Sequence, residues 1–115
     1  MTVYISGSIT GTPDNNRAAF AEAEERLRAA GYRPMNPLVI CEGLTDYEDC
    51  MRRDLAAITM CDAIVTLPWY THSRGVKREH GKADELRIPL VSIDWLETVT
   101  PIEAGRYLLK KEMMG

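Results

Sequence analysis

The sequence predicts an α/β fold, a single-domain three-layer sandwich in which a parallel sheet of four or five strands lies between layers of helices. Segments typical of strands and helices alternate along the chain in the order βαβαβαβα, and this order is typical of a parallel sheet with right-handed crossovers. The run from Asp62 to Leu67 is almost entirely apolar, as in strands buried on both faces. With 115 residues, the chain has room for one domain, residues 1–115, and not for a second.

Turn residues separate the predicted elements of the first half of the chain. Glycines and a proline within residues 7–13 end the first strand. Asp14 is the candidate N-cap of the first helix and Gly31 its C-terminal stop. The predicted elements are a strand at Thr2–Ser6, a helix at about Asn15–Ala30, a strand at Tyr32–Asn36 ended by Pro37, and a loop over residues 38–46.

The second half repeats the alternation. Apolar residues at helical spacing predict a helix from Tyr47 to Met60. Thr100 and Glu103 form a capping box around Pro101, which predicts the start of a C-terminal helix. Between these helices the predicted elements are the strand at Asp62–Leu67, a helix that begins near Ser73, and a strand at Ile88–Ile93.

Composition excludes several classes of function. The net charge of −3 argues against general affinity for nucleic-acid polymers or anionic membranes, and no apolar run of 18 residues is present. Cys41, Cys50 and Cys61 are odd in number and lack Cys-x-x-Cys spacing, which predicts three unpaired thiols in a reducing, cytoplasmic environment. We expect neither a structural metal site nor a cofactor.

Glu79 is the most informative residue of the chain. Val76, Ala83 and Leu86 lie three before, four after and seven after it, so its carboxylate shares their apolar, inward-facing stripe. A carboxylate buried there needs a partner, a raised pKa or a chemical task. The alternative is that Glu79 lies at the edge of the stripe and reaches water.

Polar residues gather where three predicted segments meet the carboxyl ends of the strands, which is where α/β sheets bind ligands. Ser73 begins the Glu79 helix, where free backbone N–H groups favour an anion, or it is only an N-cap. Asp54 lies on the inward side of its helix, or pairs with a neighbouring arginine. Trp69 can stack on a planar base, or covers the edge of the core. The loop Ser6-Gly7-Ser8-Ile9-Thr10-Gly11 can approach a phosphate or a sugar, or is a plain turn.

Four short motifs in this order resemble the nucleoside 2-deoxyribosyltransferase superfamily, particularly its small phage and bacterial members and the 2′-deoxynucleoside 5′-phosphate N-hydrolases. The motifs are Tyr4-Ile5-Ser6-Gly7-Ser8-Ile9, Arg53-Asp54-Leu55, Cys61-Asp62-Ala63-Ile64-Val65, and Ser73-x-Gly75-Val76-x-x-Glu79-x-Gly81-x-Ala83. Each is modest alone, but the ordered set spans residues 3 to 83. The resemblance implies a flavodoxin-like or Rossmann-like fold, and a homodimer or higher homo-oligomer.

The resemblance also implies roles for individual residues. Glu79 matches the nucleophile that attacks C1′ of the sugar, Asp54 the acid that assists departure of the base, and Tyr4 the phenol that orients the nucleophile. Ser8 and Ser73 match phosphate-binding serines of the hydrolase branch. The full set of expected substrate-binding residues is Ser6, Gly7, Ser8, Ile9, Trp69, Ser73, Arg74 and Gly75.

Ser73 favours one branch of the superfamily. Transferases carry an aspartate six residues before the nucleophile, whereas this chain has Ser73 followed by Arg74, a pair suited to a 5′-phosphate at a helix N-terminus. The first hypothesis is therefore an N-glycosidase that hydrolyses 2′-deoxynucleoside 5′-monophosphates without a metal. The alternatives are a deoxyribosyltransferase that exchanges bases between nucleosides and a non-catalytic nucleotide-binding or sensing module. The expected partner is a small nucleotide or nucleoside.

Overall fold

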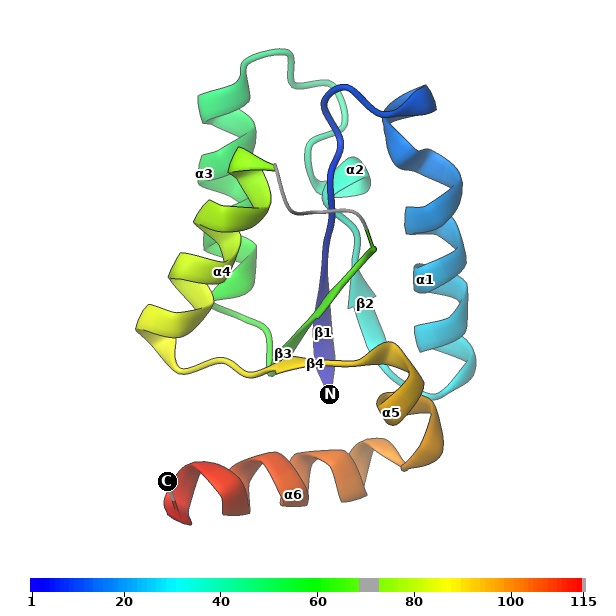
Figure 1. The fold of residues 1–115 in the computed structure, drawn as a ribbon, viewed down its shortest axis with the longest axis vertical. Helices are drawn as coiled ribbons and strands as arrows, with labels where there is room; N and C mark the ends of the chain where they lie inside the picture. The colour runs from blue at the N-terminus through cyan, green and yellow to red at the C-terminus, as the bar shows by residue number, and fades with distance from the viewer. Residues whose placement is uncertain (69–72, 115) are drawn as a thin grey trace.

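The computed structural model describes residues 1–68 and 73–114, with side chains placed as far as residue 109. Four parallel strands form one sheet in the order β2-β1-β3-β4 (Figure 1). Their bounds are Thr2–Ser6 for β1, Arg33–Met35 for β2, Ala63–Thr66 for β3 and Leu90–Val91 for β4. This confirms the predicted α/β class, the parallel sheet and the number of strands.

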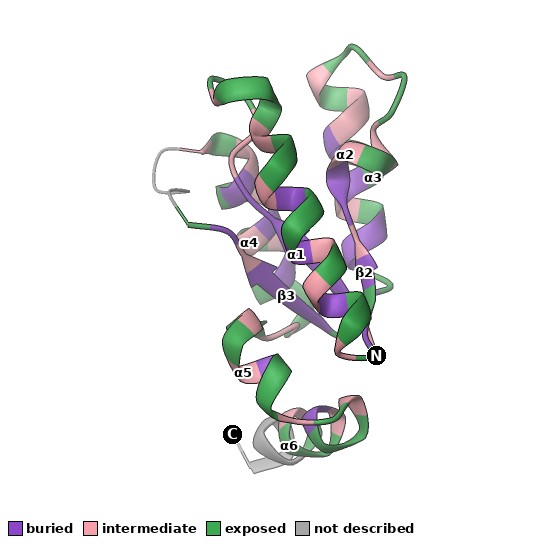
Figure 2. Ribbon diagram, turned by 90° about the vertical axis from the view of Figure 1, so that its right-hand side faces the viewer, coloured by how far each residue is buried: buried purple, intermediate pink, exposed green. Residues whose placement is uncertain are grey.

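Residues 3 to 6 of strand β1 are all buried, because helices cover both faces of the sheet at this strand. Side chains alternate along a strand, so Val3 and Ile5 share a core with helices α1 (Arg17–Ala29) and α5 (Ile93–Thr98). Tyr4 packs into a second core, beneath α3 (Tyr47–Ile58) and α4 (Arg74–Leu86). Figure 2 shows buried residues along the strands and on parts of the helices around them. Tyr4 and Ser6 therefore face α3 and α4.

The start of α1 differs from the prediction. A short 3-10 turn, Pro13–Asn16, precedes the helix, and Asp14, Asn15 and Asn16 all have positive φ angles. Asn16, and not Asp14, occupies the N-cap position. Asparagine and aspartate tolerate this left-handed backbone better than other side chains, which explains the run of three. The predicted stop at Gly31 is present, with φ +93°.

The segments predicted as a loop and as a long fourth strand contain short helices. Helix α2 (Pro37–Ile40) interrupts the expected loop over residues 38–46, and the Asn36 side chain caps it by accepting from the Leu38 N–H at 2.9 Å. The predicted strand Ile88–Ile93 shortens to β4, after which Ser92 caps α5 through the N–H groups of Asp94 and Trp95. Both helices are too short for an apolar period to mark them.

The two helices that carry the predicted acids agree closely with expectation. Asp46 caps α3 by accepting from Asp49 N–H, and Ser73 caps α4 by accepting from Val76 N–H. On α4, Val76, Glu79 and Ala83 are buried, but Leu86 is 40% exposed, so the inward stripe ends one turn earlier than predicted.

Helix α6 (Pro101–Met114) crosses the amino-terminal edge of the sheet (Figure 1). The predicted capping box is formed: Thr100 accepts from Glu103 N–H at 3.1 Å, and Glu103 accepts from Thr100 N–H at 2.9 Å. Within the described residues, no helix combines the length and apolar character needed to cross a bilayer.

Candidate active site

Glu79 is held against the end of β1 by two hydroxyl groups. Its side chain is 4% exposed; Tyr4 donates a short hydrogen bond to Oε2, and Ser6 donates to Oε1 over 2.8 Å. Burial raises the pKa of Glu79 to about 7, and the two hydroxyl donors partly oppose this because they stabilise the ionised form. Glu79 is therefore a poorly hydrated carboxylate in a defined orientation.

Asp54 lies on α3 on the same side of the sheet and is 1% exposed. Burial, and then the negative charge of Glu79, raise the pKa of Asp54 to about 7, whereas interaction with the Tyr4 hydroxyl opposes the rise. Burial, with the charges of Glu79 and Asp54, also raises the pKa of Tyr4 well above its usual value. Tyr4 therefore stays a neutral donor that interacts with both acids.

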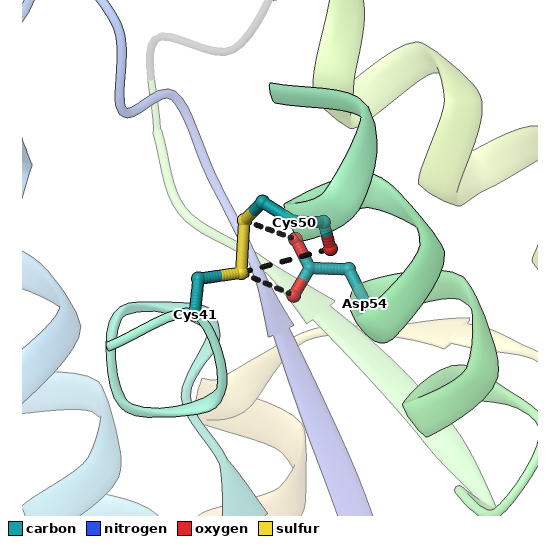
Figure 3. Close-up of side chains that lie close together, drawn as sticks. All are labelled: Cys41, Cys50 and Asp54. Atoms are coloured by element: carbon teal, nitrogen blue, oxygen red, sulfur yellow. Dashed lines mark hydrogen bonds between the residues drawn. A yellow bond between two sulfur atoms is a disulfide. The ribbon is translucent and has the colours of Figure 1, made fainter. Parts of the chain in front are cut away.

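The structure overturns the prediction of three unpaired thiols. Cys41, at the end of α2, and Cys50, on α3, form a disulfide with their Cα atoms 5.3 Å apart (Figure 3). Cys61 remains free and buried. The spacing of nine residues carries no signal for pairing; the fold of α2 against α3 brings the two cysteines together. The argument from cysteine usage for a reducing compartment no longer holds.

The disulfide contacts the Asp54 carboxyl (Figure 3). Cys41 Sγ lies 3.3 Å from Asp54 Oδ1, and Cys50 Sγ lies 3.7 Å from Oδ2. Among the described residues, these three side chains form one compact group of potential donor atoms. A metal binds thiolates, and sulfurs bonded to each other are not thiolates, so in this form the group is not a metal site.

Asp54 and Glu79 both line a cleft of about 1060 Å³, a size suited to a small-molecule ligand. It lies at the carboxyl ends of the strands. Of the predicted residues, those that line it are Gly7, Ile9, Asp54, Ser73, Arg74, Gly75 and Glu79. A second cavity of about 770 Å³, between β4 and α6, contains none of them.

The structure places Ser6 and Ser8, two predicted residues at the end of β1 and in the loop after it, in different environments. Ser6, expected to bind substrate, is fully buried and orients Glu79. Ser8 is half-buried and does not line the cleft; Asn16 donates to its carbonyl over 3.2 Å. Gly7 packs closely against Leu67: a Cβ at Gly7 would meet Leu67 Cδ1 at 2.8 Å, so a larger residue there would require a shift.

Residues at the N-terminus of α4 form one wall of the cleft. Ser73 caps the helix, and the Arg74 guanidinium lies 4.6 Å above the Tyr47 ring, a cation–π geometry that fixes its position. Glu42 and Asp46 also line this cleft, so its charge is mixed. Trp69, predicted to stack on a base, lies outside the described residues.

The environments of the two acids suit different tasks. Glu79 receives two hydroxyl donors, which favour its ionised form, whereas burial and then the charge of Glu79 favour the protonated form of Asp54. Such coupled carboxyls titrate as a pair, and a pair with one proton offers a nucleophile and an acid at once. Such a pair can attack an anomeric carbon and protonate a leaving group.

Other residues occupy structural positions. Asp62 accepts from the backbone N–H of Thr2 at 2.8 Å, as expected for a residue at chain entry. The Nε2 atom of His80 lies 3.0 Å from the Thr66 hydroxyl. The sequence analysis did not identify the cleft wall formed by Asn36 and the residues that follow it, because residues 38–46 contain no motif that points to a ligand.

Comparison with known proteins identifies one family and one fold. Residues 1–92 match the model of the family described as Domain of unknown function (DUF4406). A solved structure of a 2-deoxyribosyltransferase from the psychrotolerant bacterium Bacillus psychrosaccharolyticus is similar, with a TM-score of 0.63 and 18% identity. The similarity covers 78% of this chain and 69% of that one. No curated protein matches the chain in sequence.

Proposed function

The chain belongs to the DUF4406 family, and from the geometry of its site we propose that it cleaves the N-glycosidic bond of 2′-deoxynucleoside-type substrates through a covalent glycosyl–enzyme intermediate. One observation supports this above all. Two buried acids share a cleft, and one of them, Glu79, is oriented by Tyr4 and Ser6.

In the proposed first step a carboxylate oxygen of Glu79 attacks C1′ and the bond from C1′ to the base breaks. Asp54 gives its proton to the departing base, and Tyr4 keeps the nucleophile oriented. In the second step an acceptor attacks C1′ from the side opposite Glu79 and releases the enzyme, so the configuration at C1′ is retained overall.

The acceptor in the second step is proposed to be another base, which makes the protein a 2-deoxyribosyltransferase. The fold comparison supports transfer more than the hydrolysis expected from the sequence, because the similar solved structure is that of a 2-deoxyribosyltransferase. Hydrolysis of 5′-monophosphates remains the second candidate, since Ser73 and Arg74 line the cleft at the N-terminus of α4, where a phosphate is favoured.

The decisive experiment incubates the protein with 2′-deoxynucleosides and their 5′-monophosphates, with and without a second free base, and separates the products by chromatography. A transferase forms a new nucleoside only when the second base is present. A hydrolase releases free base without it. Nucleotide binding with no base released by either route would contradict the proposal and favour the non-catalytic binding module.

Glu79→Gln tests the nucleophile. We expect it to abolish base release while leaving substrate binding, because an amide is not an effective nucleophile at C1′. Glu85→Gln is the matched control: Glu85 lies on the same helix, its side chain is 69% exposed, and full activity is expected. Undiminished turnover by Glu79→Gln would remove the proposed nucleophile.

Asp54→Asn tests the general acid. It should lower the rate of base release by about 10²–10⁴-fold, the range for a general acid.

Ser73→Asp tests whether the N-terminus of α4 binds a phosphate. The added carboxylate should weaken the binding of monophosphate substrates about tenfold or more relative to that of nucleosides, because it repels the phosphate at close range. Ser92→Asp makes the same change at the N-cap of α5, away from the cleft, and should leave the ratio unchanged. Equal loss for both substrate classes in Ser73→Asp would argue against a phosphate at this position.

A further inference from the structure

We propose that the Cys41–Cys50 disulfide keeps the acid Asp54 protonated, and that its reduction by a dithiol lowers the acid activity of Asp54 above neutral pH by supplying a thiol donor to its carboxyl. The proposal rests on the proposed function for its catalytic consequence. Its physical part, the change at Asp54, can be measured without turnover.

The two redox states differ in whether the sulfurs can donate a hydrogen bond to the Asp54 carboxyl. The sulfurs lie 3.3 and 3.7 Å from the two carboxyl oxygens, within hydrogen-bonding range for a thiol. A disulfide sulfur carries no proton, so it gives the ionised carboxylate no hydrogen bond. Reduction lets the two sulfurs move apart, and a thiol that stays within range of the carboxyl becomes a weak donor to it. Donors to the charged form of an acid stabilise that form.

Few other ionisable groups influence the pKa of Asp54. The ionisable side chains that face it are Tyr4 from β1 and Glu79 from α4, and the disulfide brings Cys41 from α2 and Cys50 from its own helix. Neither Tyr4 nor Glu79 is a cation. Within the described residues, the sulfurs are thus the groups at the Asp54 carboxyl whose donor capacity a redox reaction can change.

The disulfide is reachable by a small reductant because Cys41 and Cys50 are only half-buried and both line the cleft. A thiolate of the dithiol attacks one sulfur and forms a mixed disulfide, and its second thiolate then attacks that bond. Two electrons and two protons pass to Cys41 and Cys50, and the reductant leaves as its own disulfide. Cys61 takes no part, since its Sγ faces Ala57 O and Met35 Sδ.

The test follows the Asp54 side-chain carboxyl by ¹³C NMR titration in EDTA, before and after reduction, with Asp54→Asn used to assign the resonance. Mass spectrometry after thiol alkylation verifies the redox state. We expect the apparent pKa of Asp54 to fall by about one unit on reduction, and base release at pH 8 to fall about tenfold, because a shift of one unit is a tenfold change in the protonated fraction.

Two double variants separate donors from the tether. Cys41→Ser with Cys50→Ser keeps two hydroxyl donors without the cross-link and should titrate like the dithiol. Cys41→Val with Cys50→Val has neither, keeps apolar volume over the carboxyl, and should titrate like the disulfide. Cys61→Ala is the matched control and should leave the redox-dependent shift intact.

An Asp54 titration that does not move on reduction would overturn the proposal, as would a double valine variant that titrates like the dithiol. Should a double variant fail to fold, the wild-type comparison alone decides between these outcomes. If no form releases base but the titration still shifts, the proposed function fails while the redox control of Asp54 stands.

Discussion

At the scale of the residue, the charge on Glu79 depends on two hydroxyl groups. Tyr4→Phe removes the donor to Oε2, so the ionised form loses stabilisation and the pKa of Glu79 rises further above about 7. Glu79 attacks only when ionised. We therefore expect the acidic limb of the kcat/KM profile to move to higher pH, with activity at pH 6 reduced about 10- to 100-fold, as a shift of one to two units requires.

Tyr32→Phe is the control for this prediction. Tyr32 is also buried, and its hydroxyl donates to the Leu96 carbonyl at 2.8 Å, in the other core. Its loss should lower stability without moving the acidic limb. A limb that stays in place in Tyr4→Phe would show that Tyr4 does not control the ionisation of Glu79.

At individual positions, helical periodicity in the sequence correctly predicted which acids are buried. Glu79 and Asp54 share inward faces with apolar neighbours, and both are buried in the structure. The pairing of Cys41 with Cys50 could not be predicted, because it depends on the packing of α2 against α3. The contact of Ser6 with Glu79 follows from strand alternation, but only once the helix above that face of the sheet is known.

At the scale of the element, the end of β1 packs tightly against the end of β3. Leu67 N–H donates to Ser6 O at 2.7 Å, and a Cβ at Gly7 would meet the Leu67 side chain at 2.8 to 3.1 Å. Gly7→Ala should therefore destabilise the protein by about 1–3 kcal/mol, the usual cost of overpacking. It should also weaken substrate binding, since Gly7 lines the cleft. Urea denaturation measures the first effect.

Gly81→Ala is the matched substitution. Gly81 lies inside α4, and a Cβ there would meet nothing within 4 Å, so the better helix propensity of alanine should add up to about 1 kcal/mol. Equal stability of the two variants would mean that the contact with Leu67 relaxes freely.

Element boundaries were predicted where residues have local signals and missed where they do not. The capping box at Thr100 and the stop at Gly31 have distinct local chemistry, and both are present. Helix α2 has four residues and α5 six, too few to show a period. The two-residue strand β4 at the sheet edge is likewise shorter than its apolar run suggests.

At the scale of the whole molecule, burial of two acids makes stability depend on pH. The pKa values of Glu79 and Asp54 are raised to about 7, from ordinary values of 4.5 and 3.8. Between roughly pH 4 and pH 7 the folded state therefore binds more protons at these sites than the unfolded state does. Stability from these groups is greatest at low pH and is lost as the pH rises to about 7.

Other acids act in the opposite direction. Hydrogen bonds from Arg78 lower the pKa of Glu48, and hydrogen bonds from Arg26 lower the pKa of Glu97. Both are surface groups, which contribute little, but the pH curve of the wild-type protein is a sum. The contribution of the buried pair is best isolated as a difference between the wild-type protein and a variant.

Glu79→Gln provides that difference. Its neutral amide avoids the cost of burying a charge, so the variant should gain stability relative to the wild type as the pH rises from 5 to 8, by an amount on the order of a few kcal/mol. Urea denaturation at both pH values, with Glu85→Gln as the exposed control, measures the gain. A constant difference would show that Glu79 is not held at a raised pKa. An increasing difference would show that the fold sacrifices stability to keep an ionisable acid in the cleft, as expected for a functional site.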